Sequence, residues 1–179
     1  MRSDAQVIKE LTAAGVPRSC WKVSITKTGR AALRDIAERM ADSKQDKGIV
    51  TSLYIQGGSI EDRWLCTELF AKQLVLSQIP VLYITFAHLA RELRVDERAE
   101  EPTRLRNLFG NGALVVPDLP DKTKEHAGYE EVCEFLVNHA YQGGIFATSG
   151  PHPVSRARSL FDEPMARLLQ ASATVFEGV

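Results

Sequence analysis

The stretch Leu53-Tyr-Ile-Gln-Gly-Gly-Ser-Ile-Glu-Asp-Arg-Trp-Leu-Cys66 joins an apolar run to an amphipathic segment. Residues 49–55 are rich in strand-forming side chains, and residues 62–77 carry apolar side chains at helical spacing. The pair Gly57-Gly58 lies between the two segments, where glycine permits a tight turn. The stretch therefore predicts a strand, a turn and a helix in direct succession.

A strand, a glycine turn and a helix in this order can form a phosphate-binding loop, whose pattern is G-x-x-x-x-G-K-[S/T]. Its glycines let backbone N–H groups surround the phosphates, its lysine reaches their charge, and its hydroxyl binds magnesium. Counted from Gly57, this chain has Asp62, Arg63 and Trp64 at the last three positions. The loop stands in the expected place but lacks the side chains that bind a nucleotide.

The composition is that of one globular domain. The chain has 179 residues, of which 44% are apolar and 25% charged, which suffices for a substantial core. A net charge of -1 and a sequence pI of about 6.4 give no overall positive field for nucleic acid or an anionic membrane. No segment has the length of a signal peptide or of a membrane span. We therefore expect a cytoplasmic protein that does not bind membranes.

The cysteines and histidines do not predict a metal site. Cys20, Cys66 and Cys133 are far apart, are odd in number and match no zinc spacing. They are typical of buried, reduced thiols. The four histidines also lack the spacing of metal ligands.

Apolar segments of strand and helix type alternate along the chain. Strands are expected at 49–55, 81–85, 113–116, 145–148 and 173–176, and helices at 4–15, 30–41, 62–77, 88–94, 129–141 and 164–170. This alternation predicts an α/β fold, a three-layer sandwich with a mostly parallel central sheet. We expect residues 1–48 to form an N-terminal helical segment packed on the core, and residues 49–179 to form the core itself.

A glycine and two polar residues follow three of the expected strands. Gly57, Asp118 and Ser149 each stand just beyond the carboxyl end of a strand. In an open α/β sheet these ends face the ligand crevice. The sequence therefore predicts that the three residues lie together at one edge.

Several segments share their order and spacing with a known family. Ala14-Gly-Val-Pro-Arg18 precedes the first strand, and residues 79–93 combine the second strand with its helix. With these segments the chain resembles the ATPase domain of the DnaC/IstB-like helicase loaders, a branch of the AAA+ P-loop proteins. Residues 114–119 are placed like Walker B, residues 147–149 like the sensor strand, and residues 165–169 like the arginine-bearing helix. The resemblance covers most of the chain and implies a P-loop NTPase fold of AAA+ type.

The Walker A position departs from this family. Arg63 stands in place of the lysine, and its planar guanidinium does not substitute for a compact ammonium held against phosphates. Trp64 stands at the magnesium hydroxyl, where its indole either fills the vacated space or stacks on a base; we favour filling. Asp62 replaces a glycine and adds a negative charge beside the expected phosphate. We expect Asp62 and Trp64 to occupy the phosphate site.

Walker B and the sensor depart as well. Asp118 keeps the metal-ligand position, where it either holds a cation or, as we favour, caps a loop. Leu119 replaces the water-activating glutamate. After Thr148 and Ser149, Gly150 replaces the sensor asparagine. Lysine, hydroxyl, base and sensor are thus lost together, which indicates a domain released from ATP hydrolysis.

Arginines near the C-terminus offer further candidates. The resemblance places Arg167 where a loader's arginine would reach the nucleotide of a neighbouring subunit, although we favour an ordinary surface position on a helix. Arg156 and Arg158 form the most basic segment of the C-terminal third, a candidate contact for DNA or a partner. Residues 91–106 carry dense alternating charge, typical of a solvated helix and loop.

These observations favour a pseudo-ATPase of helicase-loader type that acts through protein contacts in DNA replication or a related mobile-element or phage process. No cofactor is expected. Its partner would be a replicative helicase, a loader or another AAA+ subunit, and self-association is compatible with the fold. One alternative is a divergent but active ATPase that binds ATP and magnesium with Arg63 in place of lysine. A second is a DNA-binding accessory module that uses Arg156, Arg158 and residues 91–106.

Overall fold

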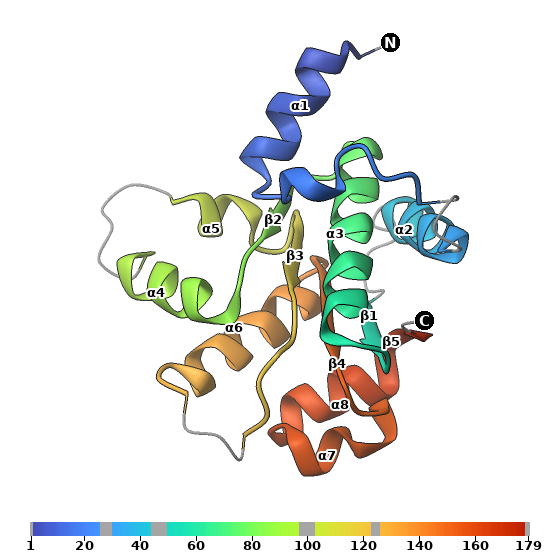
Figure 1. The fold of residues 1–179 in the computed structure, drawn as a ribbon. Helices are drawn as coiled ribbons and strands as arrows, with labels where there is room; N and C mark the ends of the chain where they lie inside the picture. The colour runs from blue at the N-terminus through green and yellow to red at the C-terminus, as the bar shows by residue number, and fades with distance from the viewer. Residues whose placement is uncertain (1, 26–29, 44–49, 97–102, 123–125, 178–179) are drawn as a thin grey trace.

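The computed structural model describes residues 2–25, 30–43, 50–96, 103–122 and 126–177. Its centre is a five-stranded sheet in the order β2-β3-β4-β1-β5, in which every neighbouring pair is parallel (Figure 1). The strands are β1 (Thr51–Gln56), β2 (Val81–Tyr83), β3 (Ala113–Val116), β4 (Ile145–Gly150) and β5 (Ala173–Glu177). The predicted parallel α/β sheet is confirmed.

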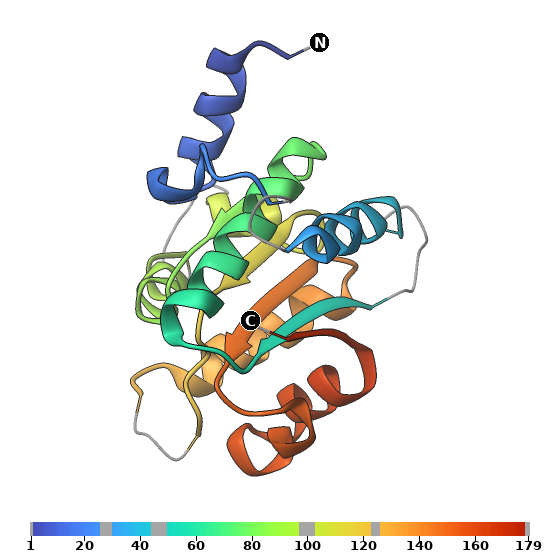
Figure 2. The ribbon, with the colours of Figure 1, turned by 45° about the vertical axis from the view of Figure 1, so that its right-hand side comes forward.

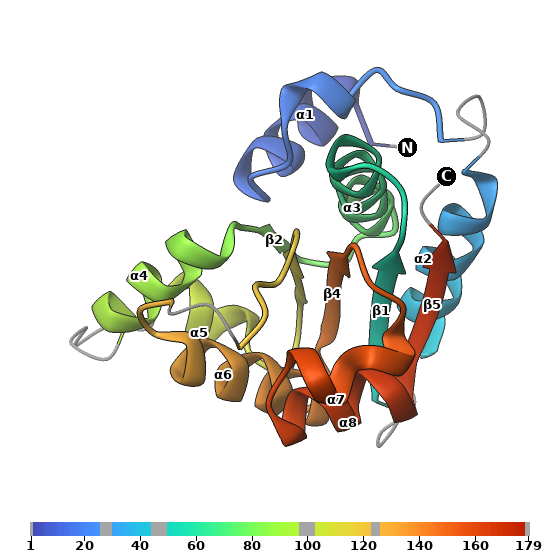
Figure 3. The ribbon, with the colours of Figure 1, turned by 60° about the horizontal axis from the view of Figure 1, so that its bottom comes forward.

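Helices cover both faces of the sheet, which gives three layers (Figure 3). One face carries α1 (Asp4–Ala13), α2 (Ala31–Ser43) and α3 (Ile60–Leu76). The other carries α4 (Phe86–Asp96), α5 (Arg104–Leu108), α6 (Tyr129–Tyr141), α7 (Ala157–Leu160) and α8 (Glu163–Ser172). Two short 3-10 turns, η1 (Arg18–Cys20) and η2 (Val154–Arg156), complete the described elements. The predicted three-layer sandwich is therefore confirmed.

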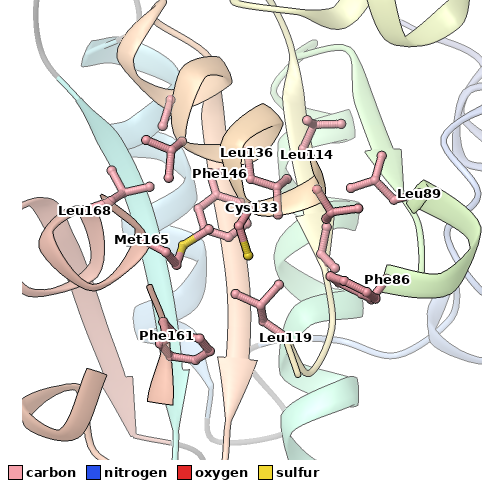
Figure 4. Packing of buried hydrophobic residues seen from close by; sticks show 14 of the residues in the cluster. Phe86, Leu89, Leu114, Leu119, Cys133, Leu136, Phe146, Phe161, Met165 and Leu168 are labelled. Carbon is pink, nitrogen blue, oxygen red and sulfur yellow. The ribbon is translucent and has the colours of Figure 1, made fainter. Parts of the chain in front are cut away.

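Alternate side chains of the strands separate two hydrophobic clusters. In β3, Ala113 and Val115 face the α3 layer, whereas Leu114 and Val116 face the α6 layer. Figure 4 shows Leu114 with Cys133 and Leu136 of α6 in the second cluster. Because both faces are covered, the strands consist of nearly continuous apolar residues.

The sequence located most elements within a few residues. The bounds of β3 and α6 agree with those predicted. In contrast, α3 begins at Ile60, two residues earlier than predicted, because the Ser59 side chain accepts a hydrogen bond from the Asp62 N–H and caps the helix. Ser3, rather than Asp4, caps α1 in the same way.

The basic segment near the C-terminus differs from the expectation drawn from the sequence. The turn η2 and helix α7 form a segment that the sequence did not predict as helical. Only two side chains of α7, Ala157 and Leu160, are buried, too few to give a helical apolar pattern.

Of the charged segment 91–106, residues 97–102 lie outside the described residues. The expected boundary after residue 48 also lies outside them.

The N-terminal segment contacts the edge of the sheet. The Ala14 carbonyl accepts a hydrogen bond of 2.8 Å from the Tyr83 N–H of edge strand β2. Gly15 has φ +75°, and a Cβ at this position would lie 2.8 Å from the Tyr83 carbonyl oxygen. Leu11 and Val16 join the hydrophobic cluster of the α3 layer. Beyond this anchor, α1 projects away from the sheet (Figures 1 and 2).

The cysteines and His139 are structural. All three cysteines are buried and unpaired, and burial raises the pKa of the Cys20 thiol to about 11 and that of Cys133 to about 12. His139 is fully buried. Its Nδ1 accepts a hydrogen bond from the Gly110 N–H, and its Nε2 lies 3.1 Å from the Ile145 carbonyl oxygen. This environment requires the neutral tautomer that carries its proton on Nε2.

Candidate functional site

The carboxyl ends of β1, β3 and β4 bring the sequence-predicted residues together. The turn of Gly57 and Gly58 follows β1, Asp118 follows β3, and Ser149 is the last residue but one of β4. The Ser149 hydroxyl donates a hydrogen bond of 2.9 Å to Asp118 Oδ1. The Asp118 N–H in turn donates to Ser149 Oγ at 3.1 Å. Gly57, Asp118 and Ser149 thus lie at one edge, as the order of the strands predicts.

Arg63 extends from the first turn of α3 across this edge. Its Nε lies 2.9 Å from Asp118 Oδ1, and its Nη2 lies 3.4 Å from Oδ2. Its Nη1 donates to the Gly58 carbonyl at 2.9 Å. Only 7% of the Arg63 side chain and 20% of the Asp118 side chain are exposed. The guanidinium therefore occupies the space between the turn and the carboxylate in a largely buried ion pair.

The Asp118 carboxylate has no acceptor site left. An ionised carboxylate offers about four lone-pair sites. In Asp118, Oδ1 receives hydrogen bonds from Arg63 Nε and Ser149 Oγ, while Oδ2 receives them from Arg63 Nη2 and, at 2.8 Å, from Trp64 Nε1. The backbone of Asp118 adopts the left-handed φ of +46°, which non-glycine residues rarely adopt. A cation could bind here only after displacing the guanidinium.

Asp62 and Trp64 have other partners at this edge, and their occupation of a phosphate site stays a prediction. Asp62 Oδ1 pairs with the Arg30 guanidinium at 3.1 Å, and its Oδ2 accepts a hydrogen bond from the Ser59 hydroxyl at 2.7 Å. Trp64 remains 40% exposed, although its indole N–H binds Asp118. The Arg63 guanidinium is more deeply buried than either of them and lies between Gly58 and Asp118.

Backbone N–H groups that follow the turn also form internal hydrogen bonds. Gly57 and Gly58 adopt left-handed φ values of 74° and 67°, so the chain reverses within three residues. The Asp62 N–H is bound to Ser59 Oγ, and the Arg63 N–H is bound to the Ser59 carbonyl. A phosphate-binding loop needs such donors free to face the ligand. At least these two are already used by the first turn of α3.

Tyr54 explains the glycine at the sensor position. A Cβ on Gly150 would lie 2.4 Å from the Tyr54 hydroxyl oxygen, so a larger side chain has no room. Tyr54 is buried, and its hydroxyl donates to the His152 carbonyl at 3.1 Å. Burial raises its pKa to about 12. A cavity of about 330 Å³ lies beside Tyr54, Arg63 and Asp118.

The remaining candidates have other contacts. Thr148 is buried and donates to the Val116 carbonyl at 2.7 Å, which is a structural bond between β4 and β3. Arg167 is 69% exposed and pairs with Glu163 at 3.3 Å on the same helix. Arg156 and Arg158 are exposed, and the Lys122 ammonium donates to the Arg158 carbonyl at 3.1 Å.

Sequence reasoning missed three residues that shape the site, namely Tyr54, Ser59 and Arg30. Only Ser59 has a local signal, because a serine three residues before an acidic residue is a helix-capping pattern. In the sequence, Tyr54 has the features of an ordinary strand residue. Arg30 is separated from Asp62 by 32 positions. Neither residue is identifiable without the tertiary fold.

No arrangement of three or more His, Cys, Asp or Glu side chains within the described ranges is suited to a metal ion. The helices that the structure describes are also too short or too polar to cross a membrane.

The fold is similar to those of replication proteins of known structure. The DnaC helicase loader aligns with a TM-score of 0.59 at 12% identity, covering 91% of this chain and 100% of that one. DnaI aligns with a TM-score of 0.56 at 16% identity over 91% of each chain. Domain III of the Thermotoga maritima replication initiation protein DnaA aligns with a TM-score of 0.56 at 15% identity. That alignment covers 80% of this chain and 60% of the DnaA chain.

No family model matches this sequence, and no curated protein matches it significantly. The likeness is therefore one of fold. The predicted resemblance to the helicase loaders is confirmed at this level, and the chain shares a three-layer α/β fold with these proteins.

We expect the Arg63–Asp118 pair to be strongly coupled. Replacing either residue by alanine should cost about 3–5 kcal/mol of unfolding free energy, because the other charge is left buried without its partner. The double variant should cost clearly less than the sum of the two. Urea unfolding of the four proteins measures this coupling.

The exposed pair Glu163–Arg167 is the matched control, and its coupling should not exceed about 0.5 kcal/mol. Additive effects of Arg63→Ala and Asp118→Ala would contradict the assigned ion pair.

Proposed function

We propose that this chain is a catalytically degenerate AAA+ domain of helicase-loader type, which acts through protein contacts in DNA replication or a related mobile-element or phage process. The observation that carries the proposal is the ion pair of Arg63 with Asp118. This largely buried pair supports the proposal because the cation beside Asp118 is the chain's own guanidinium. The fold likeness to the DnaC helicase loader and to DnaI supports the process.

The electrostatics of the site argue against Mg-ATP. Magnesium needs a carboxylate with free lone pairs, and those of Asp118 are all engaged. Binding phosphate would also bring negative charge beside Asp62, which already lies at the N-terminal turn of α3. Opening the site would require breaking a largely buried ion pair, which costs several kcal/mol.

A protein-contact role is supported by exposed apolar side chains at the same edge. Ile60 is 49% exposed and Trp64 is 40% exposed, and they stand one turn apart on α3. Aromatic side chains of this kind are enriched at the energetic centres of interfaces. We therefore assign the Ile60–Trp64 surface as the partner contact, with a replicative helicase, a loader or another AAA+ subunit as the partner.

The proposal predicts no binding of Mg-ATP. Isothermal titration calorimetry with ATP and Mg²⁺ should give no saturable heat up to about 1 mM nucleotide, an affinity limit of about -4 kcal/mol. The competing reading of a divergent active ATPase predicts micromolar binding with turnover, which Arg63→Ala would abolish. Observation of that pair of results would reject the pseudo-ATPase.

The partner surface predicts a selective loss of binding. With the purified replicative helicase of the same organism, Ile60→Ala and Trp64→Ala should each weaken association by about tenfold or more, as expected for truncated interface anchors. Tyr141→Ala is the matched control, because Tyr141 is an exposed aromatic residue of α6. Bio-layer interferometry measures the affinities. Equal effects of Trp64→Ala and Tyr141→Ala would remove the assignment of this surface.

A DNA-binding accessory role is the second candidate, and one cluster of charges favours it. Arg156 and Arg158 are exposed, and Lys122 lies against the Arg158 carbonyl. If this cluster binds single-stranded DNA, then Arg156→Gln with Arg158→Gln should lower the slope of log affinity against log salt by about 1.4, since two phosphate contacts are removed. Fluorescence anisotropy measures the slope, with Arg34→Gln as an exposed control. Binding that does not weaken with salt would exclude this role.

A further inference from the structure

A larger cavity lies at the opposite end of the sheet from the Arg63–Asp118 pair. It is bounded by α1, the C-terminal end of α3, the start of β2 and α5, and its volume is about 800 Å³. Figure 1 shows α1 rising beyond the ends of α3 and β2 in this region. Apolar side chains form much of its wall, including Ala13, Val75, Ile79, Val81 and Leu108.

Two arginines stand at this cavity, and backbone carbonyls hold both of them. Arg104 donates to the Val81 carbonyl at 3.2 Å and to the Ala13 carbonyl. Arg2 donates to the Val75 carbonyl at 3.1 Å and pairs with Glu10 at 2.7 Å. The charge of Arg2 is therefore neutralised inside the cavity. Among the residues that the structure describes, no carboxylate forms an ion pair with Arg104, although Glu92, which lines an adjacent cavity together with Arg104, acts on its charge.

A strained residue lines the same cavity. Gln78 follows α3 with φ +65°, a conformation in which helices commonly end with glycine. Its N–H donates to the Val75 carbonyl at 3.0 Å, which fixes the turn. Backbone strain of this kind is concentrated at ligand-binding positions, where a side chain is kept in spite of its cost. The Gln78 side chain contributes an amide to the cavity.

The polar groups of the cavity favour an anionic ligand. The Arg104 guanidinium and the amides of Gln78 and Asn107 supply N–H donors. The carboxylate among the lining residues, Glu10, is already bound to Arg2. A ligand with acceptor oxygens and a negative charge therefore matches the donors. The apolar wall matches a hydrocarbon or aromatic body.

We propose that this cavity is a binding site for a small amphipathic carboxylate, whose charged group meets Arg104 and whose apolar part fills the space between α1, α3 and α5. The volume falls within the range of about 300–1,000 Å³ that is typical of small-molecule sites. The ligand contacts α1 through Ala13 and the core through Val75 and Leu108, so it ties the projecting helix to the sheet. This inference does not depend on the proposed function.

Octanoate, octanol and acetate test the two halves of the ligand separately. Octanoate should bind with one site and a dissociation constant below about 1 mM, and it should perturb the backbone NMR signals of residues 13–14, 75–81 and 104–108. Octanol should bind at least tenfold more weakly, because it lacks the charge for Arg104. Acetate should show no saturable binding, because it lacks the apolar part.

Variants separate recognition of the charge from filling of the space. Arg104→Gln should weaken octanoate at least tenfold and leave octanol unchanged, whereas Arg34→Gln, at a partly exposed position of α2 away from the cavity, should change neither. Ala13→Phe, which keeps Arg104 and fills the cavity, should weaken both ligands. Circular dichroism confirms that each variant is folded. Equal affinity for octanoate and octanol, perturbations scattered away from the cavity, or unchanged binding by Ala13→Phe would each overturn the proposal.

Discussion

The ion pair between Arg63 and Asp118 is the interaction around which the site is built. A largely buried guanidinium and carboxylate are stable only together, because either charge alone would carry an uncompensated desolvation cost. Through Gly58 and Ser149 the pair also connects the turn after β1, helix α3 and the ends of β3 and β4. The hydrogen bonds of the pair therefore stabilise this edge of the sheet.

The regular part of the fold follows from local patterns. Strand β3 and helix α6 were predicted with their observed bounds, because Pro117 follows the strand and Gly128 and Gly143 flank the helix. Helix α7 was missed, since its buried residues Ala157 and Leu160 do not make a periodic pattern. Its helical form depends on packing against α8, a contact that no single segment of sequence reveals.

The sequence predicted where the site lies in the fold, but it did not predict how the side chains of the site are arranged. Parallel strands place Gly57, Asp118 and Ser149 at one edge whatever their side chains do. The orientation of Asp62 depends on Arg30, which immediately precedes α2. While Asp62 is turned toward Arg30 and Ser59, Arg63 and Trp64 both reach Asp118. In the same way, the glycine at position 150 is explained by the hydroxyl of Tyr54 on the neighbouring strand.

The sequence by itself determined the alternation of strands and helices, the parallel sheet, and the residues Asp62, Arg63 and Trp64 that follow the glycine turn. These features depend on residue type and on spacing along the chain. Only the tertiary structure decided that Arg63 pairs with Asp118, that four hydrogen bonds engage the Asp118 carboxylate, and that residues of α1, α3 and α5 line a second cavity. The reason is that side-chain pairing and cavity shape depend on distances between residues far apart in sequence. Such distances are set by the packing of the whole domain.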